Sequence, residues 1–137
     1  MSKLTDLLAS TPDIRNLPAL QTRLIETLRM GAIAAKQGKA ACCAVEARIG
    51  GPDISRRFCD LVAEVGRAWP EPFTINPPCQ YRLSYDEMLF LDMMTAAAGG
   101  DRSTFDAMTK DMLPENTRTA LYVMATRFVS LCVGNPE

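Results

Sequence analysis

The sequence predicts an all-α protein, a single-domain helical bundle of six or seven helices with one long Pro-rich connecting loop. Apolar residues recur at three- and four-residue spacing in five separate segments, and glycines and prolines separate these segments. A chain of 137 residues is long enough to bury about two-thirds of its unfolded surface. We therefore expect one domain over residues 1–137 that needs no metal or disulfide to fold.

The first predicted helix is short. Leu4, Leu7 and Leu8 follow helical spacing, and a turn signal at 10–13 ends the pattern. We expect this helix to be a lid on the core.

The second predicted helix is long and covers residues 17–37. Pro18 lies in its first turn, where the missing N–H costs nothing, and Gly38 is placed to end it in a left-handed conformation. Its last turns are rich in Gly and Ala, which allow a neighbouring helix to approach closely. Its apolar stripe consists of Leu17, Leu20, Leu24, Leu28 and Gly31.

Residues 39–49 fit both a helical stripe and the alternation of a half-buried strand. We predict a helix, because alanine is abundant and a lone strand would have no partner elsewhere in the sequence. Gly50-Gly51 then breaks the chain, Pro52 and Asp53 open the next helix, and Pro70 stops it. The core face of that helix is predicted to be Ile54, Phe58, Leu61, Val65 and Trp69.

Residues 70–83 contain four prolines and show no helical period. Loops of this length in compact domains are often functional or disordered. We expect an ordered loop, because Phe73, Ile75, Tyr81 and Leu83 would gain by docking on the surface. Replacing residues 71–80 with a flexible linker should then keep the helicity and change self-association or ligand binding, unless the loop only caps an exposed end of the core.

The central helix is predicted at 85–98. Ser84 and Glu87 form a capping box at its start, and Leu83 and Met88 stand where a hydrophobic staple would pack. The segment MLFLDMMTAAA that follows is apolar around its whole circumference, so we expect it to be buried. Left unpaired, Asp92 would be a buried carboxylate with a raised pKa, but we expect an ion pair with Arg118 or Arg127 to neutralise it.

Two more helices complete the predicted bundle. Asp101 or Ser103 caps a short helix after Gly99-Gly100, and the last helix starts at Pro114. We expect residues 115–133 to pack antiparallel to one of the longer N-terminal helices. The apolar stripe of this last helix is Thr117, Leu121, Met124, Phe128 and Leu131.

The absence of histidine excludes several kinds of site. The chain cannot form a Ser-His-Asp or Cys-His nucleophile system or any histidine-ligated metal centre. The glycine pairs lack the spacing of a phosphate-binding loop. The five cysteines contain no CxxC pair, so we predict no metal site and no cofactor.

Most of the cysteines are predicted to be small hydrophobic residues of the interior. Cys79 differs because it lies in the proline-rich loop, where exposure is expected and Arg82 could lower its pKa. A reactive or redox role is the alternative for this residue.

Six of the eight methionines lie between Met88 and Met124. We expect them to fill the core. The alternative is that they line an apolar groove for a partner helix. A different feature, the segment from Ala40 to Val65, has the outline of a DNA-binding helix-turn-helix with Arg56 and Arg57 near the start of its second helix. Its turn residues and apolar spacing match that motif poorly.

Charge and hydropathy limit the kinds of partner that the protein is expected to have. Residues 1–70 carry ten Lys and Arg and seven Asp and Glu, a net charge of +3, whereas residues 71–137 carry five and nine, a net charge of −4. The near-neutral total argues against a globally basic nucleic-acid binder, and the opposite halves could orient two protomers. With no targeting segment, no membrane span and an odd number of cysteines, we expect a cytoplasmic protein.

The leading functional expectation is a non-enzymatic regulatory or protein-interaction domain that self-associates, as a homodimer or with another protein partner. The alternative is a small-molecule-binding helical bundle or a thiol-dependent enzyme that uses Cys79, Arg82 and Asp92 around one pocket, and DNA binding through residues 53–57 is a third. The loop residues Tyr81 and Phe73 are further candidates for ligand or partner contacts.

Overall fold

The structure, a computed structural model, describes the backbone of residues 12–134 and the side chains of all of these except 41–43, 47, 133 and 134. The described part is all-α, with six α-helices, one 3-10 turn and no strand. Its elements are η1 (Ile14–Asn16), α2 (Ala19–Lys36), α3 (Ala41–Ile49), α4 (Pro52–Ala68), α5 (Tyr85–Ala98), α6 (Arg102–Thr109) and α7 (Glu115–Gly134). The predicted helix at residues 4–8 lies outside the described residues.

The helix boundaries follow the signals in the sequence. Gly38 has a φ of 72° just after α2, and Gly50 and Gly51 have φ values of 103° and 144° between α3 and α4. These left-handed conformations favour glycine because it lacks a Cβ atom. The segment 39–49 forms a helix over Ala41–Ile49, as predicted, and not a strand.

Two helix starts carry side-chain caps. The Ser84 hydroxyl accepts a hydrogen bond from the Glu87 amide, and the Glu87 carboxylate accepts one from the Ser84 amide, so the predicted capping box is confirmed. Asp101, rather than Ser103, caps α6 by accepting from the Thr104 amide.

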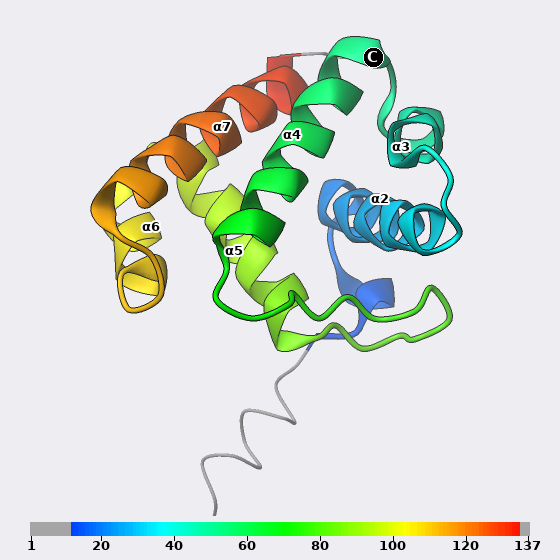
Figure 1. Cartoon of the computed structure of the whole chain (residues 1–137), viewed down its shortest axis with the longest axis horizontal. Helices are drawn as coiled ribbons and strands as arrows, with labels where there is room; N and C mark the ends of the chain where they lie inside the picture. The colour runs from blue at the N-terminus through cyan, green and yellow to red at the C-terminus, as the bar shows by residue number, and fades with distance from the viewer. Residues whose placement is uncertain (1–11, 135–137) are drawn as a thin grey trace, which may run out of the picture.

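The helices pack around one aromatic core. α2 packs against α3, α3 packs against α4, and α4 and α5 both pack against α7 (Figure 1). The start of α4 and residues Ser130 and Leu131 near the end of α7 line the same depression, so these two helices run antiparallel, as predicted. Phe58 of α4 lies at the centre, with ring centroids 6.1 Å from Phe90 and 5.3 Å from Phe128.

The predicted core face of α4 is confirmed, since all five of its residues are buried. Of the six clustered methionines, Met93 and Met94 are buried in the core and three others pack against it, whereas Met112 is 38% exposed. Core filling is therefore the role of most of this cluster. No described helix has both the length and the apolar character needed to cross a membrane.

The prediction that α5 is buried on all sides was wrong. Asp92, Thr95 and Ala98 are exposed, at the three-residue spacing of one helical face. The opposite faces are filled by the other helices, which leaves this strip of α5 in contact with water. A run whose single charge is Asp92 can still present alanine and threonine to water beside that charge, because apolar atoms make up much of any protein surface.

Candidate ligand-binding site

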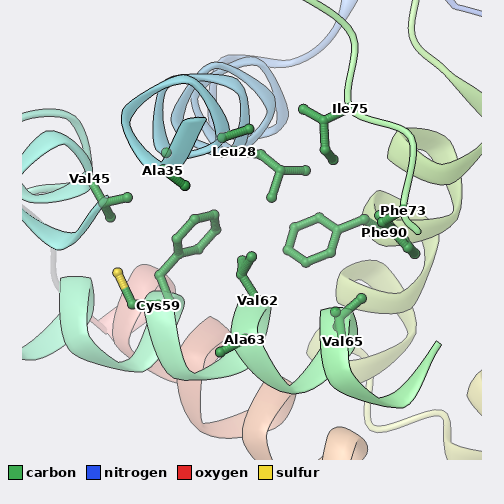
Figure 2. A pocket seen from close by; sticks show the side chains of 14 residues that line it. Leu28, Ala35, Val45, Cys59, Val62, Ala63, Val65, Phe73, Ile75 and Phe90 are labelled. Atoms are coloured by element: carbon green, nitrogen blue, oxygen red, sulfur yellow. The ribbon is translucent and has the colours of Figure 1, made fainter. Parts of the chain in front are cut away.

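An apolar cavity of about 350 Å³ lies between α2, α3, α4, α5 and the loop that follows α4 (Figure 2). Apart from the Cys59 thiol, the side chains of its lining contain only carbon and hydrogen. The lining residues are Leu28, Gly31, Ala32, Ala35, Val45, Phe58, Cys59, Val62, Ala63, Val65, Gly66, Phe73, Ile75 and Phe90.

Small residues on the two facing helices keep this cavity open. Gly31, Ala32 and Ala35 come from α2, and Ala63 and Gly66 come from α4. A Cβ atom built at Gly66 would meet no heavy atom within 4 Å, so the space beside this helix is empty. Larger residues at the same positions would fill the cavity with their own side chains.

The cavity has a closed floor and an open mouth. Phe58 and Phe90 are each 1% exposed and belong to the core, so they form part of the floor. Ala35, Ala63 and Gly66 are exposed and lie at the mouth. Cys59 is half-buried, between the floor and the mouth. A ligand could therefore enter from solvent and reach the aromatic core without crossing a polar layer.

The loop of residues 69–84 supplies one wall. Phe73 and Ile75 are half-buried and face the cavity from this loop (Figure 2). The Phe73 ring meets the ring of Trp69 edge-on, with centroids 5.2 Å apart, and Trp69 is itself buried. The loop is thus ordered and docked through its apolar residues, as the sequence predicted.

A buried ion pair holds this loop in place. The Arg29 Nε and Nη2 atoms each donate a hydrogen bond of 2.9 Å to the Glu87 carboxylate. Arg29 also donates to the backbone carbonyls of Gln80 and Arg82, at 2.6 and 3.2 Å. The pair therefore ties α2, α5 and the far half of the loop together.

The Glu87 carboxylate binds the backbone of the same loop at two further points. Its Oε2 atom accepts from the Asn76 amide at 3.0 Å, and its Oε1 atom accepts from the Ser84 amide at 2.9 Å. The Asn76 side chain in turn donates to the Arg82 carbonyl at 2.8 Å. In these hydrogen bonds the loop contributes only backbone groups and the Asn76 side-chain amide. The Arg29–Glu87 pair therefore fixes the path of the chain beside Ile75.

Two hydrogen bonds fix Thr74, the residue between Phe73 and Ile75 in the loop wall of the cavity. The Thr74 amide donates to the Asp86 carboxylate, and the Ser84 hydroxyl donates to the Thr74 carbonyl, each at 2.6 Å. The first turn of α5 thereby sets the position of Phe73 and Ile75 on either side of Thr74.

The start of the described chain is attached to the outer edge of the loop. The Ile14 amide donates to the Tyr81 carbonyl at 2.7 Å, and the Leu83 amide donates to the Pro12 carbonyl at 3.1 Å. The Arg15 guanidinium lies 3.8 Å from the centre of the Tyr81 ring. These contacts explain why the loop remains ordered although Tyr81 is 53% exposed.

The structure separates the sequence-predicted site residues. Phe73 lines the apolar cavity, and Tyr81 instead covers the Arg15 side chain. Cys79 and Arg82 are exposed on the loop and Asp92 is exposed on α5, so none of these three lines the cavity. The pocket that was expected to gather Cys79, Arg82 and Asp92 is therefore not this cavity.

Asp92 also lacks the predicted ion pair. Partial burial raises its pKa, as expected for a carboxylate beside apolar side chains, but no salt bridge joins it to a base within the described residues. Arg118 is engaged instead by Asp106, at 3.1 Å, and by Glu115. The buried carboxylate of α5 is Glu87, one turn and a half earlier.

Sequence reasoning missed Arg29, Glu87 and Cys59 as residues of this region. Arg29 follows Ile25 by four residues, so it lies on the apolar side of α2, and a base on an apolar face is a signal for a buried partner. Glu87 was interpreted only as a capping residue, although it also opens the most apolar segment of the chain.

A second cavity, of about 310 Å³, has a charged lining that includes Arg15, Arg29, Glu26 and Arg48. Each of these bases is paired: Arg15 with Asp13, Arg29 with Glu87, and Arg48 with Glu26. Charge compensation leaves little attraction for an anion here, and the apolar cavity is the stronger candidate.

The described cysteines are thiols. Cys79 is exposed, Cys59 and Cys132 are half-buried, and burial raises the pKa of the Cys132 thiol to about 11. Within the described residues no three His, Cys, Asp or Glu side chains are grouped as metal ligands would be. The thiol of Cys59 is therefore the one chemically reactive group in the wall of the apolar cavity.

This arrangement can hold an apolar molecule, because it offers contact area and no buried polar group to satisfy. It gives a ligand a hydrogen-bonded loop on one side and an open path on the helix side. Compared with known proteins, the chain matches no family model, no curated protein and no solved structure.

Proposed function

We propose that this protein is a non-catalytic binding domain whose ligand is a small apolar molecule, or the apolar part of an amphipathic one, held in the cavity between α2 and α4. The observation that carries this proposal is the lining: fourteen residues around about 350 Å³, with the Cys59 thiol as their one heteroatom-bearing side chain.

Packing considerations support a binding role. Protein interiors contain few voids larger than a water molecule, because each void forfeits dispersion contacts. An apolar cavity of about 150 Å³ stays dry and takes up benzene or xenon, and ligand pockets begin at about 300 Å³. Because the mouth of this cavity is open, its apolar walls face water while no ligand is bound, and an apolar ligand would cover them and add dispersion contacts.

The lining also selects the kind of ligand. A polar group carried into the cavity would lose its hydration and find no hydrogen-bond partner apart from the weak thiol. A hydrocarbon chain or ring can fill the interior, whereas any charged group must stay at the mouth near Ala35 and Ala63. Phe73 and Ile75 on the fixed loop wall would set the width that the ligand can have.

A fluorescence titration tests this function. N-Phenyl-1-naphthylamine, an uncharged apolar dye, should bind with one-to-one stoichiometry and change the emission of Trp69, the one tryptophan of the chain, which packs on the cavity residue Phe73. Gly66→Leu places a side chain in the open space beside α4 and should weaken dye binding at least tenfold.

Ala120→Leu is the matched control, because Ala120 is exposed on α7 and does not line the cavity. This variant should bind the dye as the unmodified chain does. Equal affinity of the unmodified chain and Gly66→Leu, or no saturable binding to either, would contradict the proposal.

The other functional expectations stay predictions. Self-association rests on the opposite charges of the two halves, and DNA binding rests on Arg56 and Arg57, which are exposed on α4. The presence of Cys59, Cys79 and Cys132 as thiols supports the proposal that the protein works in a reducing compartment such as the cytoplasm.

A further inference from the structure

We propose that the apolar cavity takes a single-chain carboxylate of the fatty-acid class, with the alkyl chain inside and the carboxylate at the mouth, on the Lys36 ammonium group. This inference rests on the proposed function and deepens it, because it names the class of ligand and the base that selects it.

Burial falls along the face of α2 that lines the cavity. Leu28 is buried, Ala32 is half-buried and Ala35 is exposed. Lys36 is the last residue of α2 and follows Ala32 by four positions, so it lies on the same face, one turn further along the helix. The apolar lining of α2 therefore leads outward from the buried floor and ends at a positive charge in water.

The Lys36 side chain is suited to cover the mouth. Helical side chains lean towards the N-terminus of their helix, so Lys36 is directed over the turn that contains Ala32 and Ala35. Ala35 lies across the cavity from Ala63 of α4 (Figure 2). The methylene groups of a lysine extend apolar surface while its ammonium group stays hydrated. A carboxylate can therefore meet Lys36 without leaving water.

The charge of Lys36 is not compensated by the acids on the facing helix. No salt bridge within the described residues includes Lys36. On α4, Glu64 is paired with Arg67, and Asp60 leans towards the start of that helix, away from Ala63 at the mouth. One uncompensated base matches a head group of one negative charge, such as a carboxylate, better than a phosphate that carries nearly two.

Calorimetric titration with decanoate, decan-1-ol and decyltrimethylammonium tests this assignment, because the three share an alkyl chain and differ in the charge of the head group. Lys36 is exposed, so the ion pair contributes modestly. Lys36→Gln should lower the ratio of decanoate to decan-1-ol affinity about two- to fivefold. Lys36→Glu should lower it further and strengthen the binding of decyltrimethylammonium. Added salt should reduce these differences, because exposed charges are screened.

Lys110→Gln and Lys110→Glu are the matched controls. Lys110 is also an exposed lysine at the C-terminal end of a helix, α6, and α6 contributes no residue to the cavity lining. These variants change the net charge by the same amounts as the Lys36 variants. They should leave the ratio of decanoate to decan-1-ol affinity unchanged. Equal effects at the two lysines, or no effect at Lys36, would overturn the inference.

Gly66→Leu and decan-1-ol separate this inference from the proposed function. If decan-1-ol and decanoate both bind and Gly66→Leu weakens both, but the Lys36 variants change neither, the proposed function is retained and the head-group selection is rejected. No saturable binding of any of the three ligands contradicts both. Decanoate binding that depends on Lys36 but not on Gly66 would put the alkyl chain outside the cavity and overturn the inference.

Discussion

Arg29 and Glu87 form a two-pronged ion pair in the interior, with two hydrogen bonds of 2.9 Å and side chains that are 1% and 0% exposed. The residues are separated by 58 positions in the chain, and each binds backbone groups of the same loop. A charged pair in such a place is stabilising only when its remaining hydrogen-bonding groups are satisfied, and the loop backbone satisfies them here.

Arg29→Met should therefore lower the free energy of unfolding by about 3 to 5 kcal/mol, because it leaves the Glu87 carboxylate buried without a partner. Urea unfolding followed by circular dichroism measures this loss. Arg48→Met is the matched control: Arg48 pairs with Glu26 at 3.2 Å on the surface, so its replacement should cost about 1 kcal/mol or less. Losses of equal size in the two variants would refute the structural role of the buried pair.

Gly66→Ala should stabilise the protein by about 0.5 to 1 kcal/mol. Gly66 lies inside α4, where alanine has the higher helix propensity, and the added methyl group meets nothing within 4 Å. Gly50→Ala should instead destabilise it, because Gly50 has a φ of 103°. Thermal melts of both variants check this contrast, and a lower melting temperature for Gly66→Ala would mean that the cavity wall is not open there.

The stability of the protein should depend on the ionisation of Cys132. Burial raises its pKa from 9.0 to about 11, so the folded state favours the neutral thiol. This contribution is fully present below pH 9 and is lost as the pH rises towards 11. Urea midpoints at pH 8 and pH 10.5 should therefore fall less in Cys132→Ala than in the unmodified chain. An identical fall in both would show that the Cys132 thiol is not differentially protonated.

The sequence predicted the fold well because the relevant signals are local. Gly38, the Gly50-Gly51 pair and the Ser84–Glu87 box each set a boundary through backbone geometry or hydrogen bonds within a few residues. The ambiguous segment 39–49 was resolved correctly by alanine content and by the lack of a partner strand.

The candidate site was harder to predict because it is made by residues that are distant in the chain. Arg29 and Glu87 find each other only when α2 and α5 pack. Asp92 was expected in the interior because the run around it has almost no other polar residue and so does not reveal which side faces water. A cavity formed by Gly31, Ala63 and neighbouring small residues is equally hidden, since alanines and glycines in helices also indicate close packing.

Alkylation of the thiols tests the central claim, that the apolar cavity holds an apolar ligand, most directly. Cys59 lies in the cavity wall and Cys79 is exposed on the outer part of the loop, so one chain carries both the reporter and its control. Rates of carbamidomethylation by iodoacetamide are measured at each cysteine by peptide mass spectrometry, with and without saturating N-phenyl-1-naphthylamine. We predict that the dye slows the reaction of Cys59 at least fivefold and leaves that of Cys79 unchanged. A Cys59 rate that the dye does not alter would contradict binding in this cavity.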